Sequence, residues 1–176
     1  MKLFYLDESG FSPSLPTGYS WCLPQQRKRV PYEYPQGRRV NVLASYAPDE
    51  SQPWLDAQAF ERTLKSEDLI GYLQERLPVA TVPQVVVLDN ASMHVSRETK
   101  SARRELARQG IYLYYLPAYS PELNGIETVF KQIKHHEISQ RSHTSKAELR
   151  KSVEQGFDSY ARKLCLKRNK ELRPAA

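Results

Sequence analysis

The sequence contains few cysteines and no long apolar run, and each absence excludes a class of protein. Its 176 residues include only Cys22 and Cys165, which are too few and too isolated for a disulfide framework or a cysteine-based zinc site. No stretch approaches the roughly 20 consecutive apolar residues that span a bilayer. The first ten residues carry acidic side chains and no small-residue cleavage site, so a secretory signal is not expected. We therefore expect a cytoplasmic protein without a membrane partner.

The composition is typical of a globular protein with an excess of basic residues. Hydrophobic residues make up 40% and charged residues 26% of the chain, and its length suits a single domain, residues 1–176. The net charge of +6 favours a polyanionic partner. One basic segment is the C-terminal tail, about residues 162–176, which a solvated surface helix would explain equally well. A second basic cluster lies in a loop rich in Pro, Gly and Tyr and consists of Arg27, Lys28, Arg29, Arg38 and Arg39.

The hydrophobic pattern predicts five strands in a mixed sheet. Short apolar or alternating runs that are bounded by turn residues are typical of strands. The first three runs most simply form an antiparallel meander, because turn residues separate them. The run VVVL is apolar throughout, as expected for a central strand that is covered on both faces. The predicted strands are residues 2–6, 18–23, 38–46, 84–88 and 111–116.

The spacing of apolar residues also predicts four helices. Ser66 is suited to cap the first helix, and Pro78 to end it. The second helix begins near Ser96 and is closed by Gly110. A third helix follows the SPEL turn, and a capping box at residues 145–148 starts the last one. The resulting order, βββαβαβαα, predicts an α/β fold with helices on both faces of the sheet.

Three acidic residues occupy the positions where catalytic groups collect in such a fold. Asp7 and Asp89 each end a hydrophobic strand, and Glu127 lies near the start of the third helix. If the first and fourth strands are neighbours, the three carboxylates converge and need cations to relieve their repulsion. Carboxylate oxygens suit Mg²⁺ or Mn²⁺, and two such ions about 3.5–4 Å apart can cleave a phosphodiester.

Each acid also has an ordinary structural explanation. An aspartate at the end of a strand is commonly a turn former or a helix cap, and Asp89-Asn90 is a good turn pair. Glu127 could simply interact with the dipole at the start of its helix. Composition and spacing by themselves leave both interpretations open.

The chain contains three distinctive segments, FYLDESGF (4–11), VVVLDNASMH (85–94) and LPAYSPELNGIETVFKQIK (116–134). They resemble the signature blocks of DDE-type transposases of the Tc/mariner superfamily, most closely the bacterial insertion-sequence branch. The blocks occur in the family's order and cover nearly the whole chain, and the third is the most specific. The resemblance implies an RNase H-like fold, in which three antiparallel strands and two further strands form a mixed sheet.

The resemblance also implies roles for particular residues. The acidic triad falls on Asp7, Asp89 and Glu127, with 37 residues (90–126) between the last two, slightly more than is usual in the superfamily. Asp7 and Asp89 would hold two Mg²⁺ or Mn²⁺ ions, and Glu127 would complete the second site. The nearby acids Glu8 and Glu122 are expected to be supporting groups, Glu8 because it points to the opposite side of its strand.

Several polar residues beside the triad are further candidates. Asn90, His94 and Asn124 are expected to support the triad or to face DNA, although a turn amide and an ordinary surface histidine would explain Asn90 and His94 as well. Asn124 is expected to cap the third helix. Gly125 stands where the family commonly has Pro, which predicts a looser first helical position. The residues expected to contact DNA are Arg27, Lys28, Arg29, Arg38, Arg39, Lys131 and Lys134.

The resemblance implies the catalytic domain of a metal-dependent transposase, which cleaves DNA at transposon ends and transfers the strand to target DNA. Relatives carry N-terminal helix-turn-helix modules, which this chain is expected to lack, so a separately encoded DNA-binding subunit is a possible partner. A homodimer is expected in the active complex, in the bacterial cytoplasm with the nucleoid. The alternatives are an RNase H-like nuclease without strand transfer, or a catalytically silent transposon-derived DNA-binding remnant.

Overall fold

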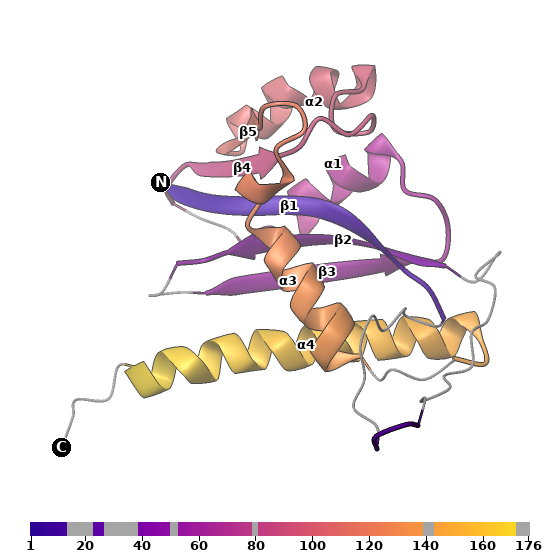
Figure 1. Ribbon diagram of the computed structural model, residues 1–176. Helices are drawn as coiled ribbons and strands as arrows, with labels where there is room; N and C mark the ends of the chain where they lie inside the picture. The colour runs from indigo at the N-terminus through magenta and orange to yellow at the C-terminus, as the bar shows by residue number, and fades with distance from the viewer. Residues whose placement is uncertain (14–22, 27–38, 50–52, 79–80, 139–142, 172–176) are drawn as a thin grey trace.

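A five-stranded mixed sheet forms the centre of the fold (Figure 1). The computed structural model describes residues 1–13, 23–26, 39–49, 53–78, 81–138 and 143–171, with the side chains of 167–171 excepted. In this part of the chain the strand order is β3-β2-β1-β4-β5. The strands are β1 (Lys2–Phe11), β2 (Val40–Ala47), β3 (Trp54–Phe60), β4 (Gln84–Leu88) and β5 (Ile111–Tyr115).

Strand β1 lies between the antiparallel and the parallel parts of the sheet. It pairs antiparallel with β2, from Tyr5 opposite Tyr46 to Phe11 opposite Val40. On its other side it pairs parallel with β4, up to Tyr5 opposite Val87. The first and fourth strands of the sequence prediction are therefore neighbours, which is the condition for their terminal acids to meet. β1 continues past the expected end at residue 6, because β2 supplies hydrogen-bonding partners for the polar residues that follow.

The third antiparallel strand was not predicted at its actual position. The structure forms it from β3, whose sequence WLDAQAF mixes polar and apolar residues and lies at the edge of the sheet. Six of its seven residues are only partly buried, so its hydrophobic pattern is weak. The strand predicted at 18–23 lies outside the described residues except for Leu23, which is not in a strand. The prediction for 38–46 corresponds to β2.

Helices cover both faces of the sheet, as predicted. Helices α1 (Ser66–Glu75) and α2 (Arg97–Arg108) enclose one apolar core, which includes Phe4, Leu6 and Leu88. Helices α3 (Ile126–Gln132) and α4 (Lys146–Glu171) enclose a second core on the other face. Figure 1 shows α3 crossing the sheet and α4 running beside β3. The side chains of odd-numbered β1 residues such as Tyr5 and Phe11 pack on the α3 and α4 side.

The helix ends follow the local sequence, with two corrections. Ser96 caps α2 by accepting from Thr99 N at 3.1 Å, and Gly110 follows α2 with a φ of +82°. The residue before α1 is Lys65, whereas Ser66 was predicted to cap this helix. The Asp68 carboxylate accepts a hydrogen bond from Lys65 N at 2.8 Å. At α4 the Glu148 side chain reaches back to Thr144, one residue earlier than a standard capping box.

Two short segments complete the connections. A 3₁₀ turn, η1 (Pro121–Leu123), precedes α3, and a π-helical turn, η2 (Ile133–Glu137), follows it. The third signature segment thus runs from the end of the edge strand β5, through η1, to α3 on the face of the sheet against β1 and β2. Among the described residues, no helix has both the length and the apolarity that crossing a bilayer requires.

Candidate active site

The three predicted acids line one pocket at the end of β4. Asp7 lies within β1, Asp89 follows the last residue of β4, and Glu127 lies in the first turn of α3. Continuing the parallel register of β1 and β4 places residue 7 opposite residue 89. The pocket has a volume of about 460 Å³, and Asn90 and Asn124 also line it. The tertiary structure thus brings together all three predicted carboxylates and two of the three predicted supporting residues.

Asp7 is a buried carboxylate that is held on both oxygens. Glu8 N donates to Oδ1 at 2.8 Å, and Asn124 Nδ2 donates to Oδ2 at 3.3 Å. Only 7% of Asp7 is exposed. Burial raises the pKa of Asp7 to about 7, and the charges of Glu8 and Asp89 add to this, while the bond from Glu8 N and the charge of His94 oppose it. A nearby cation would favour the charged form of this group.

Asp89 uses one carboxylate oxygen for internal hydrogen bonds. Ala91 N donates to Oδ1 at 2.9 Å, and His94 Nδ1 lies 2.6 Å from the same atom. Oδ2 accepts no hydrogen bond from the described residues, and the side chain is 45% exposed. One oxygen of Asp89 is therefore available to a ligand in the pocket.

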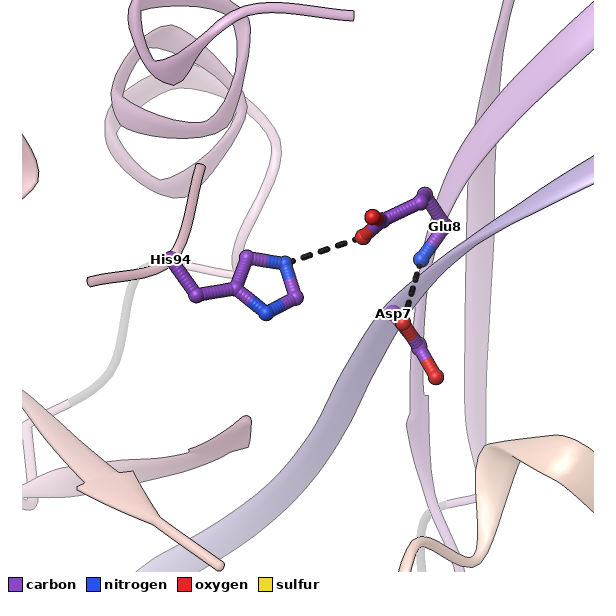
Figure 2. Close-up of side chains that lie close together, drawn as sticks. All are labelled: Asp7, Glu8 and His94. Atoms are coloured by element: carbon purple, nitrogen blue, oxygen red, sulfur yellow. Dashed lines mark hydrogen bonds and ion pairs between the residues drawn. The ribbon is translucent and has the colours of Figure 1, made fainter. Parts of the chain in front are cut away.

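His94 is buried, so its interpretation as a surface histidine was wrong. None of its side chain is exposed, and Nε2 lies 3.0 Å from Glu8 Oε2 (Figure 2). This is an ion-pair distance, although the alignment of the two groups falls short of a hydrogen bond. Burial lowers the pKa of His94, but Glu8 and then Asp89 outweigh that effect, and the net direction is upward. The contact between Glu8 and His94 was not predicted from the sequence.

Glu8 extends away from Asp7, as the alternation of a strand predicts. Figure 2 shows the Glu8 carboxylate directed at His94 and the Asp7 carboxylate directed elsewhere. Ligand atoms of Asp7, Glu8 and His94 nevertheless lie within 4.8 Å of one another, so this group could hold a metal ion. Glu122 is exposed in η1 and does not line the pocket.

The two asparagines connect the pocket to the surrounding segments. Asn90 Nδ2 donates to Leu116 O at 2.7 Å and so joins the end of β4 to the end of β5. Asn124 is 2% exposed, and its Oδ1 has no hydrogen-bond partner among the described residues. Asn124 does not cap α3, because its side chain is directed at Asp7 and Gly125 is the residue before the helix.

Gly125 makes room for an aromatic ring on β1. Its φ of −58° already suits a helix start and would also suit proline. However, a Cβ atom at this position would lie 3.0 Å from two carbons of the Tyr5 ring. This backbone conformation is the one that proline would also adopt, and the looser first helical position stays a prediction. Glycine permits the close approach of the Tyr5 ring on β1 to the start of α3.

Some of the predicted basic residues lie near Glu127. Lys134 Nζ donates to Ser9 Oγ at 2.7 Å and lies 5.1 Å from the centroid of the Phe11 ring. Burial lowers the pKa of Lys134, the charge of Glu127 opposes that, and Arg39 adds to it. Arg39 and Lys131 are exposed. The remaining predicted DNA contacts, Arg27, Lys28, Arg29 and Arg38, lie outside the described residues.

The donor set of the pocket suits a hard divalent cation. Carboxylate and amide oxygens are the ligands that Mg²⁺ and Mn²⁺ prefer. Asn124 Oδ1 is a buried oxygen without a hydrogen-bond partner in the described part of the chain, and Asp7 is a carboxylate whose charge is disfavoured by burial. A bound cation would satisfy both groups, so the residues present fit such an ion.

Comparison with known proteins establishes the family. The family model described as DDE superfamily endonuclease matches residues 2–150. The chain belongs to the DDE superfamily of endonucleases. No curated protein matches the sequence. Membership implies a nuclease-type enzyme, whereas the predicted assignment to the bacterial insertion-sequence branch stays a prediction.

Solved structures of the Mos1 mariner transposase have the same fold as this DDE superfamily endonuclease. The Mos1 strand transfer complex aligns with a TM-score of 0.62 at 16% identity over 96% of this chain. A pre-cleavage Mos1 transpososome aligns with a TM-score of 0.62 at 14% identity over 99%. The chain covers 52% and 57% of these two Mos1 chains, so it spans about half of their length. The predicted RNase H-like mixed sheet is confirmed.

Proposed function

We propose that this DDE superfamily endonuclease is the catalytic domain of a DNA transposase. It would cleave strands at transposon ends and join the freed 3′-hydroxyl to target DNA. The observation that carries the proposal is the meeting of Asp7, Asp89 and Glu127, from three separate elements, at one pocket. Their number and residue types match the triad that the resemblance implies. We also propose that residues 1–176 form one catalytic domain.

Each residue of the pocket would have a separate role. Asp7 and Asp89 would hold two divalent ions between β1 and β4, and Glu127 would complete the second site from α3. Bound ions supply activation of a water or 3′-hydroxyl and stabilisation of the leaving oxygen. Asn124 would keep the Asp7 carboxylate oriented through its 3.3 Å contact. Support for a divalent ion also comes from a Mos1 paired-end complex that was determined with Mn.

DNA is the proposed partner. The Mos1 structures include a paired-end complex with the left transposon end, and the present chain carries a net charge of +6. Lys131 lies four residues after Glu127 in α3, on the same side of the helix, where it can reach a phosphate near the pocket. We propose in addition that the active complex is a homodimer and that it associates with the nucleoid. A separately encoded DNA-binding subunit is a further proposed partner.

Replacing Lys131 with Gln is expected to weaken DNA binding uniformly across sequences. Loss of one phosphate contact reduces the magnitude of the negative slope of log association constant against log salt concentration by about 1. Fluorescence anisotropy of a labelled duplex between low and moderate salt measures the slope. Lys100→Gln is the matched control, because Lys100 is an exposed lysine on α2, which covers the other face of the sheet. Equal slopes for both variants would place the DNA away from α3.

Cleavage and joining assays test the proposed reaction. The full chain is incubated with duplexes that carry candidate transposon ends and with Mg²⁺ or Mn²⁺. Pre-cleaved ends with a free 3′-hydroxyl are then tested for joining to a plasmid. We expect metal-dependent cleavage and joined products. Cleavage without joining would favour a nuclease, and DNA binding without either reaction would favour a silent remnant.

A further inference from the structure

The hydrogen bonds of Asp89 separate the two oxygens of its carboxylate. Oδ1 is occupied by Ala91 N and by His94 Nδ1, at 2.9 Å and 2.6 Å. Oδ2 has no such partner among the described residues, and Asp89 lines the pocket with Asp7 and Glu127. The internal bonds therefore leave a single oxygen of Asp89 for a ligand in the pocket.

His94 is rigidly placed to make its bond. The ring is fully buried, and its backbone is fixed by His94 N donating to Ala91 O at 2.9 Å. Tyr115 Oη donates to His94 O at 2.8 Å, which ties the same residue to β5. A buried side chain in a fixed backbone loses little freedom when it makes a contact, so its direction is set before any ligand binds.

Glu8 contacts the second nitrogen of the His94 ring. Its carboxylate lies 3.0 Å from Nε2, and the Glu8 side chain is 32% exposed (Figure 2). The ring thus has one carboxylate at each nitrogen, Asp89 at Nδ1 and Glu8 at Nε2. Strand β1 supplies Asp7 to the pocket on one side and contacts Asp89 through Glu8 and His94 on the other.

We propose that Glu8 and His94 are positioning residues, which hold Asp89 Oδ1 out of the pocket and present Oδ2 to the divalent cation. A carboxylate with its rotamer fixed in this way binds the ion through one oxygen and in one direction. Hydrogen-bonding partners behind a metal ligand typically contribute about 10–100-fold to metal affinity or activity. This inference rests on the proposed function only where DNA cleavage is measured, because metal binding is measured without DNA.

Two substitutions of His94 separate a positioning role from a general structural one. His94→Asn places an amide nitrogen where Nδ1 is and retains the donor to Asp89. His94→Gln carries its amide nitrogen further out, near the position of Nε2, and removes that donor. We expect His94→Asn to bind Mn²⁺ within about 3-fold of wild type, and His94→Gln to bind it roughly 10–100-fold more weakly.

Mn²⁺ binding is measured on the full chain without DNA, by calorimetry and by electron paramagnetic resonance. Cleavage is then titrated with Mn²⁺, and His94→Gln should need a correspondingly higher concentration. Glu8→Ala is a second variant for the case in which His94→Gln does not fold, because Glu8 is partly exposed. It should weaken Mn²⁺ binding by about 10-fold. Thermal melting verifies that each variant is folded.

The possible results distinguish the inference from the proposed function. If wild type binds Mn²⁺ and cleaves DNA, and His94→Gln and Glu8→Ala match it in both, the positioning role is wrong and the function stands. Histidine nitrogen coupling in the Mn²⁺ spectrum would also overturn the inference, because it would make His94 a ligand. If wild type binds Mn²⁺ with the expected dependence on His94 but cleaves nothing, the proposed function fails and the positioning role stands.

Discussion

Replacing Asp89 with Asn is expected to reduce metal-dependent DNA cleavage by roughly 10²–10³-fold or more, with folding and non-specific DNA binding retained. The neutral amide keeps an oxygen for the bonds from Ala91 N and His94, so the loop after β4 should hold its shape. It loses the negative charge that would hold a divalent cation in the pocket. Asp7→Asn and Glu127→Gln should have the same effect, since both side chains line that pocket.

The matched control for this experiment is Glu122→Gln. Glu122 is exposed, lies in η1 close to Glu127 in the chain, and does not line the pocket. Its replacement removes the same charge and should leave cleavage within a few-fold of wild type. Cleavage rates and duplex binding are compared for all four variants. Wild-type turnover in any triad variant would refute that residue's assignment, and loss of cleavage in Glu122→Gln would mean that the active acid was misidentified.

The Asp7→Asn variant is also expected to be more stable than the wild type at pH 8 in the absence of metal. The folded protein raises the pKa of Asp7 from 3.8 to about 7, chiefly because the carboxylate is buried. Ionising it in the folded state therefore costs free energy, at most about 4 kcal/mol at 1.36 kcal/mol per pKa unit. Asparagine keeps the shape and an acceptor for Glu8 N but carries no charge. The acid that we propose for catalysis should thus lower the stability of the metal-free fold.

The sign of the pH dependence follows from linkage. Below pH 3.8 Asp7 is protonated in both states and contributes no pH dependence to the free energy of unfolding. Between about pH 4 and 7 the unfolded chain releases the proton while the folded chain retains it, so stability falls as pH rises. Above about pH 7 the loss is complete and constant. The advantage of Asp7→Asn should therefore grow from pH 4 to 7 and then remain level.

Denaturant unfolding of wild type and Asp7→Asn across this range measures the effect. Asp158→Asn, which removes an exposed carboxylate from α4, controls for the general loss of one negative charge. Mg²⁺ or Mn²⁺ should stabilise the wild type at pH 8 more than it stabilises Asp7→Asn. A difference between wild type and Asp7→Asn that does not change with pH would show that burial does not disfavour the charge on Asp7.

Much of the fold was predictable because local signals agreed with the tertiary structure. The apolar run of β4 and the helical spacing of α2 and α3 are local patterns, and the elements form close to the predicted positions. Strand β3 was missed for a physical reason. It is an edge strand that is only partly buried, so its own polar and apolar residues do not alternate clearly. Its pairing with β2 makes it a strand, and that pairing is not visible in its local sequence.

The candidate site divides in the same way. Asp7, Asp89 and Glu127 were identified from their place at the ends of elements and from the resemblance of the surrounding segments, and the structure places them at one pocket. The burial of His94 was not accessible, because from the sequence an ordinary surface histidine was an equally good interpretation. In the structure the ring is fully buried, with Asp89 at Nδ1 and Glu8 of β1 at Nε2.

The sequence by itself determined which residues are candidates for the chemistry, because strand ends, helix starts and signature segments can be recognised from short-range patterns of polar and apolar residues. The tertiary structure alone decided that Asp7 is buried, that Glu8 meets His94, and that one oxygen of Asp89 is occupied. These features depend on the parallel register of β1 and β4, which brings together segments that are far apart in the chain. Hydrogen bonding and desolvation depend on which atoms lie within a few ångströms of each other. The order of residues along the chain does not directly give the distances between residues that are far apart in sequence.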